Sequence, residues 1–296
     1  MIKYPDVQGT KPDIPMAIQK VGVKGVLYPI IIRRGEREIH LYSTIDVFVD
    51  VPASRKGADL SRTIEAIENV TDQPAKVSGV EFLAEDIAEK VLSKFPYSTR
   101  SEVHLEADYF SERSPEDGKK HMVKYRIISR SVASKDSSVT SIGIIVHGIN
   151  ACPCAMETTR AMTGEEFPLE GDILAKIPSI THNQRNTVTV VIQTDRAHQL
   201  EIDDLIDIAE KPVNGPLVSV LKRRDEGELV YKAHKNPKFV EDIVREVAES
   251  IAISYPDFPE DYGVEITSES DESIHPHNAF AKVHSTFGEL RKSLKS

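Results

Sequence analysis

Two neighbouring segments with the pattern of β-strands constrain the fold most. Residues 39–51 alternate apolar and polar side chains along their length, and residues 27–32 before them are almost entirely apolar. Arg34, Gly35 and Glu36 between the two segments are typical of a hairpin turn. Because strands joined by a short turn pair antiparallel, this part of the chain predicts an antiparallel sheet.

The order of the expected elements extends this prediction along the chain. Apolar residues at helical spacing predict helices over 60–68 and 79–92, and alternation predicts strands over 101–110 and 121–132, joined by a polar turn at 114–119. A second, less regular series has strands at 141–147 and 187–194, helices at 199–209 and 239–252, and strands at 263–270 and 279–283. The repeated order strand, strand, helix, helix, strand, strand predicts an α+β fold with an antiparallel sheet. Residues 1–20, with three prolines, are expected to form an arm across the surface or a partner subunit.

Composition narrows the class of protein. The formal net charge is −10, so there is no basic excess to neutralise phosphates, which argues against general nucleic-acid binding. No signal peptide and no apolar run of transmembrane length are present, so we expect no membrane association. Two adjacent cysteines without a disulfide framework favour the cytoplasm.

The only two cysteines, Cys152 and Cys154, flank Pro153. The apolar run 141–146 before them predicts a buried strand, and the residues after Pro153 predict a helix. A thiol at such a helix N-terminus meets backbone N–H groups and the positive pole of the helix, which favour the thiolate that binds metals or attacks carbon. The alternative is a buried, inert pair of thiols. A disulfide between them is disfavoured, because residues two apart rarely meet the required geometry.

Four polar groups in the second half of the chain accompany the cysteines. Taken singly, each has an ordinary explanation: a capping residue, a helix-end carboxylate, a solvated charge run or a hydrophilic loop. Together they supply imidazoles and carboxylates near the ends of elements, and with a thiolate these are ligands that Zn²⁺ and Fe²⁺ accept. The residues alone do not decide between two classes: a metal-dependent enzyme, and a structural or binding protein. The groups are 181–185, just before the expected strand at 187, Glu210 at a helix end, 221–226, and 269–277.

Several motifs occur here in the order and character in which they occur in the type IB GTP cyclohydrolases. The chain resembles that family over nearly its whole length. The insertion between the cysteines and His182, and the segment 23–26, resemble the archaeal branch. The motifs are Cys152-Pro153-Cys154, His182-Asn183-Gln184-Arg185, Leu221-Lys222-Arg223 with Asp225-Glu226, the segment 236–242, and Glu272-Ser273-Ile274-His275 with His277.

The resemblance implies a tunnelling fold (T-fold): tandem ββααββ units with antiparallel sheets and helices on one face, which assemble between subunits into a barrel. We therefore expect one enzyme domain over 1–296, built of an N-terminal half at 20–135 and a C-terminal half at 136–290 that carries most site residues. The expected assembly is a homo-oligomer, a dimer or a tetramer.

The resemblance also implies a reaction. Members open the imidazole ring of GTP at C8, release formate and form a dihydroneopterin product for folate-type or methanopterin-type pterins. The archaeal type ends at 7,8-dihydroneopterin 2′,3′-cyclic phosphate and uses Fe²⁺, for which Zn²⁺ or Mn²⁺ are possible substitutes. A metal-bound water supplies a nucleophile at neutral pH, because the metal lowers the pKa of that water.

Roles for individual residues follow from the same resemblance. His182 is either a ligand or a proton-transfer partner, and either Glu226 or Glu272 anchors the guanine while the other acts as a base. An exposed charge run is an equally open explanation for Arg223 and Arg224. The expected metal ligands are Cys152, His182, Glu210 and His275; the catalytic residues are Cys152, His182, Glu272 and His277; the substrate-binding residues are Glu226, Arg185, Lys222 and Arg223, with Arg224 as a further phosphate contact.

Two other functions fit the same fold. One is a pterin- or purine-binding protein without ring-opening activity, which would not need the metal ligands. The other is a nitrile reductase, which uses an unmetallated cysteine as its nucleophile and needs a nicotinamide site. Metal content separates the latter from a metal-dependent cyclohydrolase.

Overall fold

The computed structural model describes residues 5–34, 37–72, 79–114, 119–167 and 176–295. The chain forms two compact units, each assembled from separated segments. The first unit comprises Met1–Tyr109, Arg126–Ile142 and Gln193–Gln199, and the second comprises Phe110–Tyr125, Gly143–Ile192 and Leu200–Ser296.

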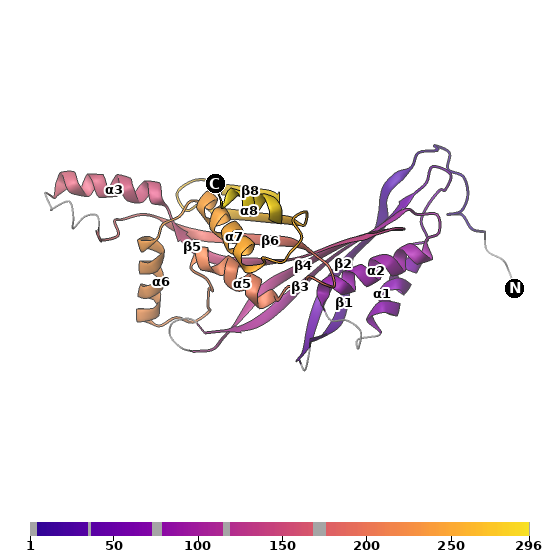
Figure 1. Cartoon of the computed structure of the whole chain (residues 1–296), viewed down its shortest axis with the longest axis horizontal. Coiled ribbons are helices and arrows are strands. Elements are labelled where there is room, and N and C mark those ends of the chain that lie inside the picture. Colours follow the sequence, from indigo (N-terminus) through magenta and orange to yellow (C-terminus); the bar gives the residue numbers. More distant parts are fainter. Residues whose placement is uncertain (1–4, 35–36, 73–78, 115–118, 168–175, 296) are drawn as a thin grey trace. The chain divides into compact units, whose positions relative to one another are not determined.

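The strands follow one another across an eight-stranded sheet in chain order, from β1 to β8 (Figure 1). The strand pairs at both ends of this order are antiparallel, which confirms the predicted α+β class with an antiparallel sheet. The strands are β1 (Ile18–Arg34), β2 (Arg37–Val51), β3 (Arg100–Arg113), β4 (His121–Ser134), β5 (Ser138–Ala151), β6 (Asn183–Thr194), β7 (Gly263–Asp271) and β8 (Ala279–Thr286).

In the first unit, two neighbouring helices cover one face of the strands. They are α1 (Ser61–Thr71) and α2 (Val80–Lys94), close to the ranges that their apolar spacing predicts. Alternate residues of β2, such as Ile45 and Val47, are fully buried. Ser101 on β3 donates a hydrogen bond to the carbonyl oxygen of Ala88 on α2 at 2.5 Å, so the buried face of the strands is the helix-covered one.

In the second unit, the helix α7 (Val240–Ser254) packs on β7 and β8. Its inward residues Ile243, Val247 and Ile251 are fully buried, as are Val188 and Ile266 of the strands. This unit also contains the helices α3 (Pro153–Glu166), α5 (Ile202–Glu210), α6 (Arg223–Lys235) and α8 (Phe287–Ser293), and a short 3₁₀ turn, η2 (Lys211–Val213), follows α5.

Three features of the second unit differ from the sequence predictions. Strand β6 begins at Asn183, so the 183–185 motif lies within the strand and not before it. Helix α6 occupies the segment expected to be a charge run; Ala233 is its only buried residue, so it shows no apolar stripe. Helix α8 begins at a capping box between Thr286 and Glu289 that was not recognised. The turns expected at 34–36 and 114–119 lie mostly outside the described residues.

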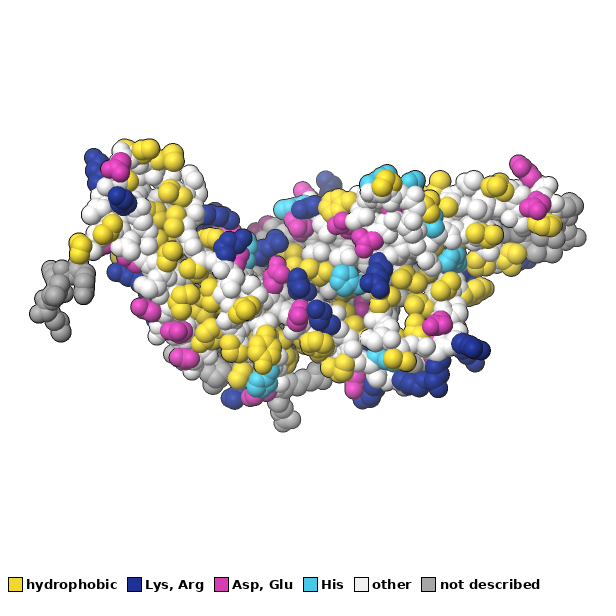
Figure 2. All heavy atoms as spheres, turned by 180° about the vertical axis from the view of Figure 1, so that it is seen from behind, with side chains coloured by type: hydrophobic (Ala, Val, Ile, Leu, Met, Phe, Trp, Pro, Cys, Tyr) yellow, Lys and Arg dark blue, Asp and Glu magenta, His cyan; other side chains and the backbone are white. Residues whose placement is uncertain are grey.

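The face seen from behind carries charged and histidine side chains with hydrophobic ones between them (Figure 2). In the first unit, the Glu102 carboxylate on β3 accepts hydrogen bonds from Lys20 on β1 and from His104, both at 2.6 Å. Within the described part of the chain, every helix is too short or too polar to cross a membrane.

Candidate active site

Cys152 occupies the junction between β5 and α3, as its sequence context predicts. It is the N-cap of α3, and its sulfur accepts a hydrogen bond from the N–H of Ala155 at 3.5 Å. Its own N–H donates to the carbonyl oxygen of His182 at 3.1 Å, and its carbonyl accepts from the Thr181 hydroxyl at 2.7 Å. Cys152 is therefore fixed to both α3 and the segment that enters β6. Cys154, two residues on, is exposed.

Cys152 lines a pocket of about 210 Å³. The walls come from the ends of β5 and β7, the starts of β6, β8, α3 and α7, and the segment just before α7. Among the residues that line it are Gln184, Lys238, Glu241, Glu272 and Phe280. The pocket thus joins segments far apart in the sequence, all within the second unit.

His182 and Glu272 meet beside this pocket. The Nδ1 atom of His182 lies 3.1 Å from the Ser273 hydroxyl and 3.9 Å from a carboxylate oxygen of Glu272. Both side chains are 12% exposed. An imidazole next to a carboxylate can take up and release a proton. Three of the predicted site residues, Cys152, His182 and Glu272, therefore lie near one another at one end of the sheet, and two of them form such a pair.

Gln184 is a pocket residue for which the sequence suggested no separate role. It is 8% exposed, and its amide oxygen is buried without a hydrogen-bond partner among the described residues. A buried amide without a partner costs free energy, and native structures seldom tolerate it unless a ligand or a water completes the bonding. The sequence shows that Gln184 belongs to the motif at 182–185, but only the fold shows that its side chain is buried.

The charge of the pocket is more negative than positive. Glu241 and Glu272 line it, and Lys238 already forms an ion pair with Glu246. Glu241 and Asp242 also occupy the first turn of α7, where they offset the positive pole of the helix. The pocket therefore suits the N–H groups of a ligand better than its phosphates.

Glu210 ends α5 and is 5% exposed. The Tyr125 hydroxyl donates to one of its oxygens at 2.6 Å, and the guanidinium of Arg113 donates to the Tyr125 hydroxyl at 3.2 Å. Burial raises the pKa of Glu210 to about 7, although the Tyr125 hydrogen bond and the charge of Arg113 act to lower it. The side chain of Glu210 packs closely against the following loop, because a Cβ on Gly215 would lie 2.9 Å from the Cγ of Glu210.

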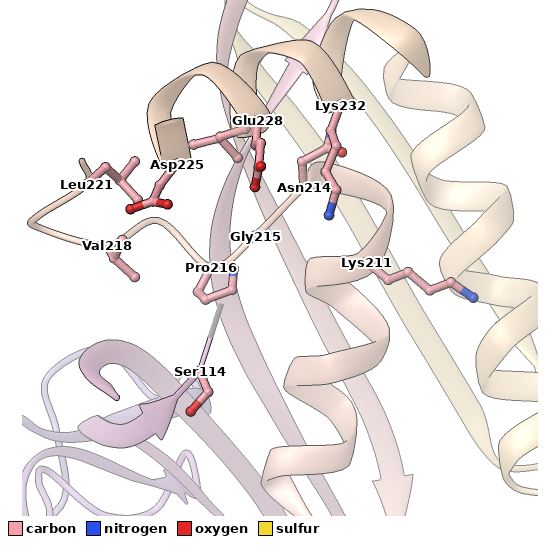
Figure 3. Close-up of a pocket in the computed structure, with 11 residues that line it drawn as sticks. Ser114, Lys211, Asn214, Gly215, Pro216, Val218, Leu221, Asp225, Glu228 and Lys232 are labelled. Carbon is pink, nitrogen blue, oxygen red and sulfur yellow. The ribbon is translucent and has the colours of Figure 1, made fainter. Parts of the chain in front are cut away.

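A second pocket, of about 350 Å³, lies between α6 and the loop that follows Glu210 (Figure 3). Asp225, Glu228 and Lys232 line it from α6, and Asn214 and Pro216 line it from the loop. Figure 3 shows the side chain of Lys211 pointing away from the other labelled residues. The predicted substrate residues Lys222, Arg223 and Glu226 are not among those that line it; they are exposed on the same helix or at its start.

The remaining predicted residues lie on the surface of the second unit. His275 and His277 are exposed in the loop between β7 and β8, with their rings stacked 5.2 Å apart, and Arg185 is exposed on β6. The donor types around Cys152 suit a divalent metal. The described residues nevertheless contain no group of three or more His, Cys, Asp and Glu side chains placed to hold a metal ion.

Comparison with known proteins decides the family. The model of the type I GTP cyclohydrolase folE2 family matches residues 4–281. The chain belongs to this family.

Curated relatives of this cyclohydrolase extend over its full length. It is 40% identical over 292 residues to GTP cyclohydrolase MptA of Thermoplasma acidophilum, and the match covers 99% of each chain. It is 39% identical over 298 residues to GTP cyclohydrolase MptA of Thermoplasma volcanium, again with 99% of each chain covered. These relatives confirm the resemblance to the archaeal branch of the family.

A solved structure supports the fold of this cyclohydrolase. The uricase from Arthrobacter globiformis superposes with a TM-score of 0.55 at 7% sequence identity, covering 90% of this chain and 93% of that chain. This likeness concerns the fold alone and agrees with the predicted T-fold class. The tandem units and the oligomeric barrel stay predictions.

Proposed function

We propose that this protein is a GTP cyclohydrolase that opens the guanine imidazole ring of GTP at C8 and releases formate, forming a dihydroneopterin product. The observation that carries the proposal is the Cys152 pocket. In a chain of the cyclohydrolase family, the pocket contains a thiol at a helix N-terminus and a buried amide oxygen that has no hydrogen-bond partner among the described residues, and an imidazole–carboxylate pair lies beside it.

The pocket is proposed to take the base of GTP. Its acceptors, Glu241 and Glu272, match the N–H groups on the pyrimidine edge of guanine, and Gln184 offers an amide to the same ring system. Phe280 adds an apolar surface for a flat heterocycle. Glu272 is therefore favoured over Glu226 as the guanine anchor, because Glu226 is exposed on α6 and does not line the pocket.

The triphosphate is proposed to extend out of the pocket toward basic surface residues. Lys222, Arg223 and Arg185 are exposed, and arginine is suited to bidentate contacts with phosphate. Arg224 is a weaker candidate, because its guanidinium is bound to Glu228 at 2.8 Å.

A divalent metal, Fe²⁺ with Zn²⁺ or Mn²⁺ as substitutes, belongs to the same proposal. Cys152, His182, Glu210 and His275 would hold it, and when bound it supplies an activated water. The chain's own residues would supply the proton transfers: if His182 is not a ligand, it would exchange a proton at Nδ1, which lies 3.9 Å from a carboxylate oxygen of Glu272. His277 is proposed as a second proton carrier.

The remaining parts of the proposal concern product and assembly. We propose 7,8-dihydroneopterin 2′,3′-cyclic phosphate as the product in place of the triphosphate, in a pathway to methanopterin-type cofactors, because the resemblance to the archaeal branch implies it. A homo-oligomer in the cytoplasm is proposed, as in the resemblance set out above.

The test is an oxygen-free GTP assay that measures formate release and metal content together. We expect formate release by the wild type and a fall of at least about 100-fold in turnover for Glu272→Gln, because a group that moves protons or anchors the base is lost. Glu226→Gln is the matched control on the exposed face of α6. A stronger loss in Glu226→Gln would reverse the assignment of the anchor.

The same assay tests the rival functions. GTP binding without formate release would indicate a purine-binding protein. A metal-free protein that reacts with a nitrile and a nicotinamide cofactor would indicate a nitrile reductase. Either result would overturn the proposed function.

A further inference from the structure

Asn150 joins three segments at the floor of the Cys152 pocket. It is the second-last residue of β5 and is 2% exposed. Its amide nitrogen donates to the carbonyl oxygen of Lys238 at 3.1 Å, and its amide oxygen accepts from the Ser270 hydroxyl at 3.4 Å. The neighbouring Ala151 carbonyl accepts from the N–H of Lys238 at 3.2 Å. Asn150 therefore links β5 to β7 and to the residues that lead into α7.

Each linked segment carries one wall of the pocket. Strand β5 leads to Cys152, β7 leads to Glu272, and the segment after Lys238 leads to Glu241. The side chain of Lys238 is also tied to Glu246, further along α7, so the start of this helix moves with Lys238. The side chain of Asn150 thus helps to hold the thiol and the two carboxylates at their spacing, together with the backbone hydrogen bond between Lys238 and Ala151.

A second buried asparagine, on the adjacent strand, lacks this arrangement. Asn186 on β6 is fully buried, and its amide oxygen accepts from the Ser268 hydroxyl at 2.9 Å. Its amide nitrogen has no hydrogen-bond partner among the described residues, so it makes no link to α7. Asn186 is a neighbour of the same type and similar burial whose hydrogen bond reaches only the adjacent strand β7.

We propose that Asn150 is a positioning residue, which holds the start of α7 and the end of β7 at a fixed distance from Cys152 and so aligns the reacting groups. It touches no reacting atom in this role. The inference rests on the proposed function, since alignment matters only if the pocket binds the substrate.

Two pairs of variants separate positioning from structural support. Asn150→Leu removes both links at similar side-chain volume, and Asn186→Leu removes a local bond of the same kind. Ser270→Ala removes one link with little risk to folding, and Ser268→Ala is its control. For each purified full-length protein, kcat and KM for GTP and the unfolding midpoint are measured without oxygen.

We expect kcat to fall about 100-fold in Asn150→Leu and about fivefold in Ser270→Ala, with KM changed less than kcat, because small displacements of reacting groups chiefly slow the chemical step. Asn186→Leu and Ser268→Ala should keep the wild-type kcat per folded protein. Hydrogen exchange of the 236–242 amides should increase in Asn150→Leu and not in Asn186→Leu.

Equal kcat losses in the Asn150 and Asn186 variants, or an unchanged kcat in Ser270→Ala, would overturn the inference. If Asn150→Leu fails to fold, the Ser270 and Ser268 pair still decides. A wild type that releases no formate refutes the proposed function instead, and the two failures are therefore distinct.

Discussion

Cys152 and Cys154 differ in surroundings although they are two residues apart. The sequence predicted the first of these environments, because an apolar run followed by Cys-Pro marks a strand end and a helix start. The structure adds that Cys152 lines a pocket while Cys154 is exposed on the first turn of α3. The two thiols should therefore respond differently to substitution.

We expect Cys152→Ala to lose activity and bound metal, and Cys154→Ala to keep measurable activity. Only the first substitution removes a thiol from the pocket. Formate release and metal content, measured on both variants without oxygen, provide the check. Equal metal loss in the two variants would show that both thiols serve one site.

Gly148 is a residue whose role cannot be deduced from sequence. A Cβ at this position on β5 would lie 2.1 Å from the carbonyl oxygen of Val213, in the 3₁₀ turn just after Glu210. The close approach lets the segment that carries Glu210 lie against the strand that leads to Cys152. Nothing in the local pattern around Gly148 indicates this contact, because its partner is remote in the chain.

Gly148→Ala should lower the free energy of unfolding by about 1–3 kcal/mol through overpacking. Gly227→Ala is the matched control: Gly227 lies within α6 with no atom within 4 Å of an added Cβ, so alanine should raise stability by about 0.5–1 kcal/mol. Chemical denaturation of both variants measures the effect. Stabilisation by Gly148→Ala would contradict the close approach.

At the scale of elements, the expected helices and strands of the first unit were close to those observed, because alternation and helical spacing report directly on a buried face. The prediction of helices and strands failed where the sequence has no periodic apolar pattern. Helix α6 has a single buried residue, and the 183–185 motif is polar although it lies within β6. Gln184 and Glu241 were likewise not recognised as pocket residues, since their meeting requires β6 and α7 to converge.

Glu102 ties β1 to β3 through Lys20, a residue 82 positions away that sequence reasoning could not pair with it. Glu102 is 8% exposed. Burial acts to raise the pKa of Glu102, but the hydrogen bonds from Lys20 and His104 outweigh it and hold the pKa below its usual value. The ionised form is thus favoured by folding.

Glu102→Gln should therefore lower the free energy of unfolding at pH 7 by about 1 kcal/mol. The effect is small because Lys20 is half exposed, so solvent screens its charge. A lowered carboxyl pKa contributes stability that is present above the unfolded pKa and lost as the pH falls through the folded pKa. The wild type and the variant should converge below pH 4. Denaturation from pH 7 to pH 3 tests this, with the exposed Glu106→Gln as the control. A gap that widens in acid would refute the assignment.

At the scale of the molecule, each compact unit is assembled from separated pieces of chain. The second unit includes Phe110–Tyr125, which supplies the Tyr125 hydroxyl to Glu210 and the Arg113 guanidinium to Tyr125. The order of elements in the sequence does not reveal this exchange of segments, because it shows which strands follow one another and not which core each strand joins.

A fragment of residues 136–296 should not fold stably. It lacks the segment that completes the second unit, leaves Glu210 without its hydroxyl partner and exposes the edge of β5 that β4 would pair. Thermal unfolding followed by circular dichroism tests the fragment against the full chain. A cooperative transition in the fragment would show that the missing segment is dispensable.

The sulfur of Cys152 caps α3 as well as lining the pocket. A ligand bound to the sulfur changes the charge and the free lone pairs that the first turn of this helix meets, and the full loss of a cap would change helix stability by about 1 kcal/mol. The chain contains no tryptophan, so a tryptophan placed at the exposed Phe167, where α3 ends, would be its only indole. A change in its fluorescence would report that a ligand has bound at the Cys152 thiol, and this measurement would not require catalytic turnover.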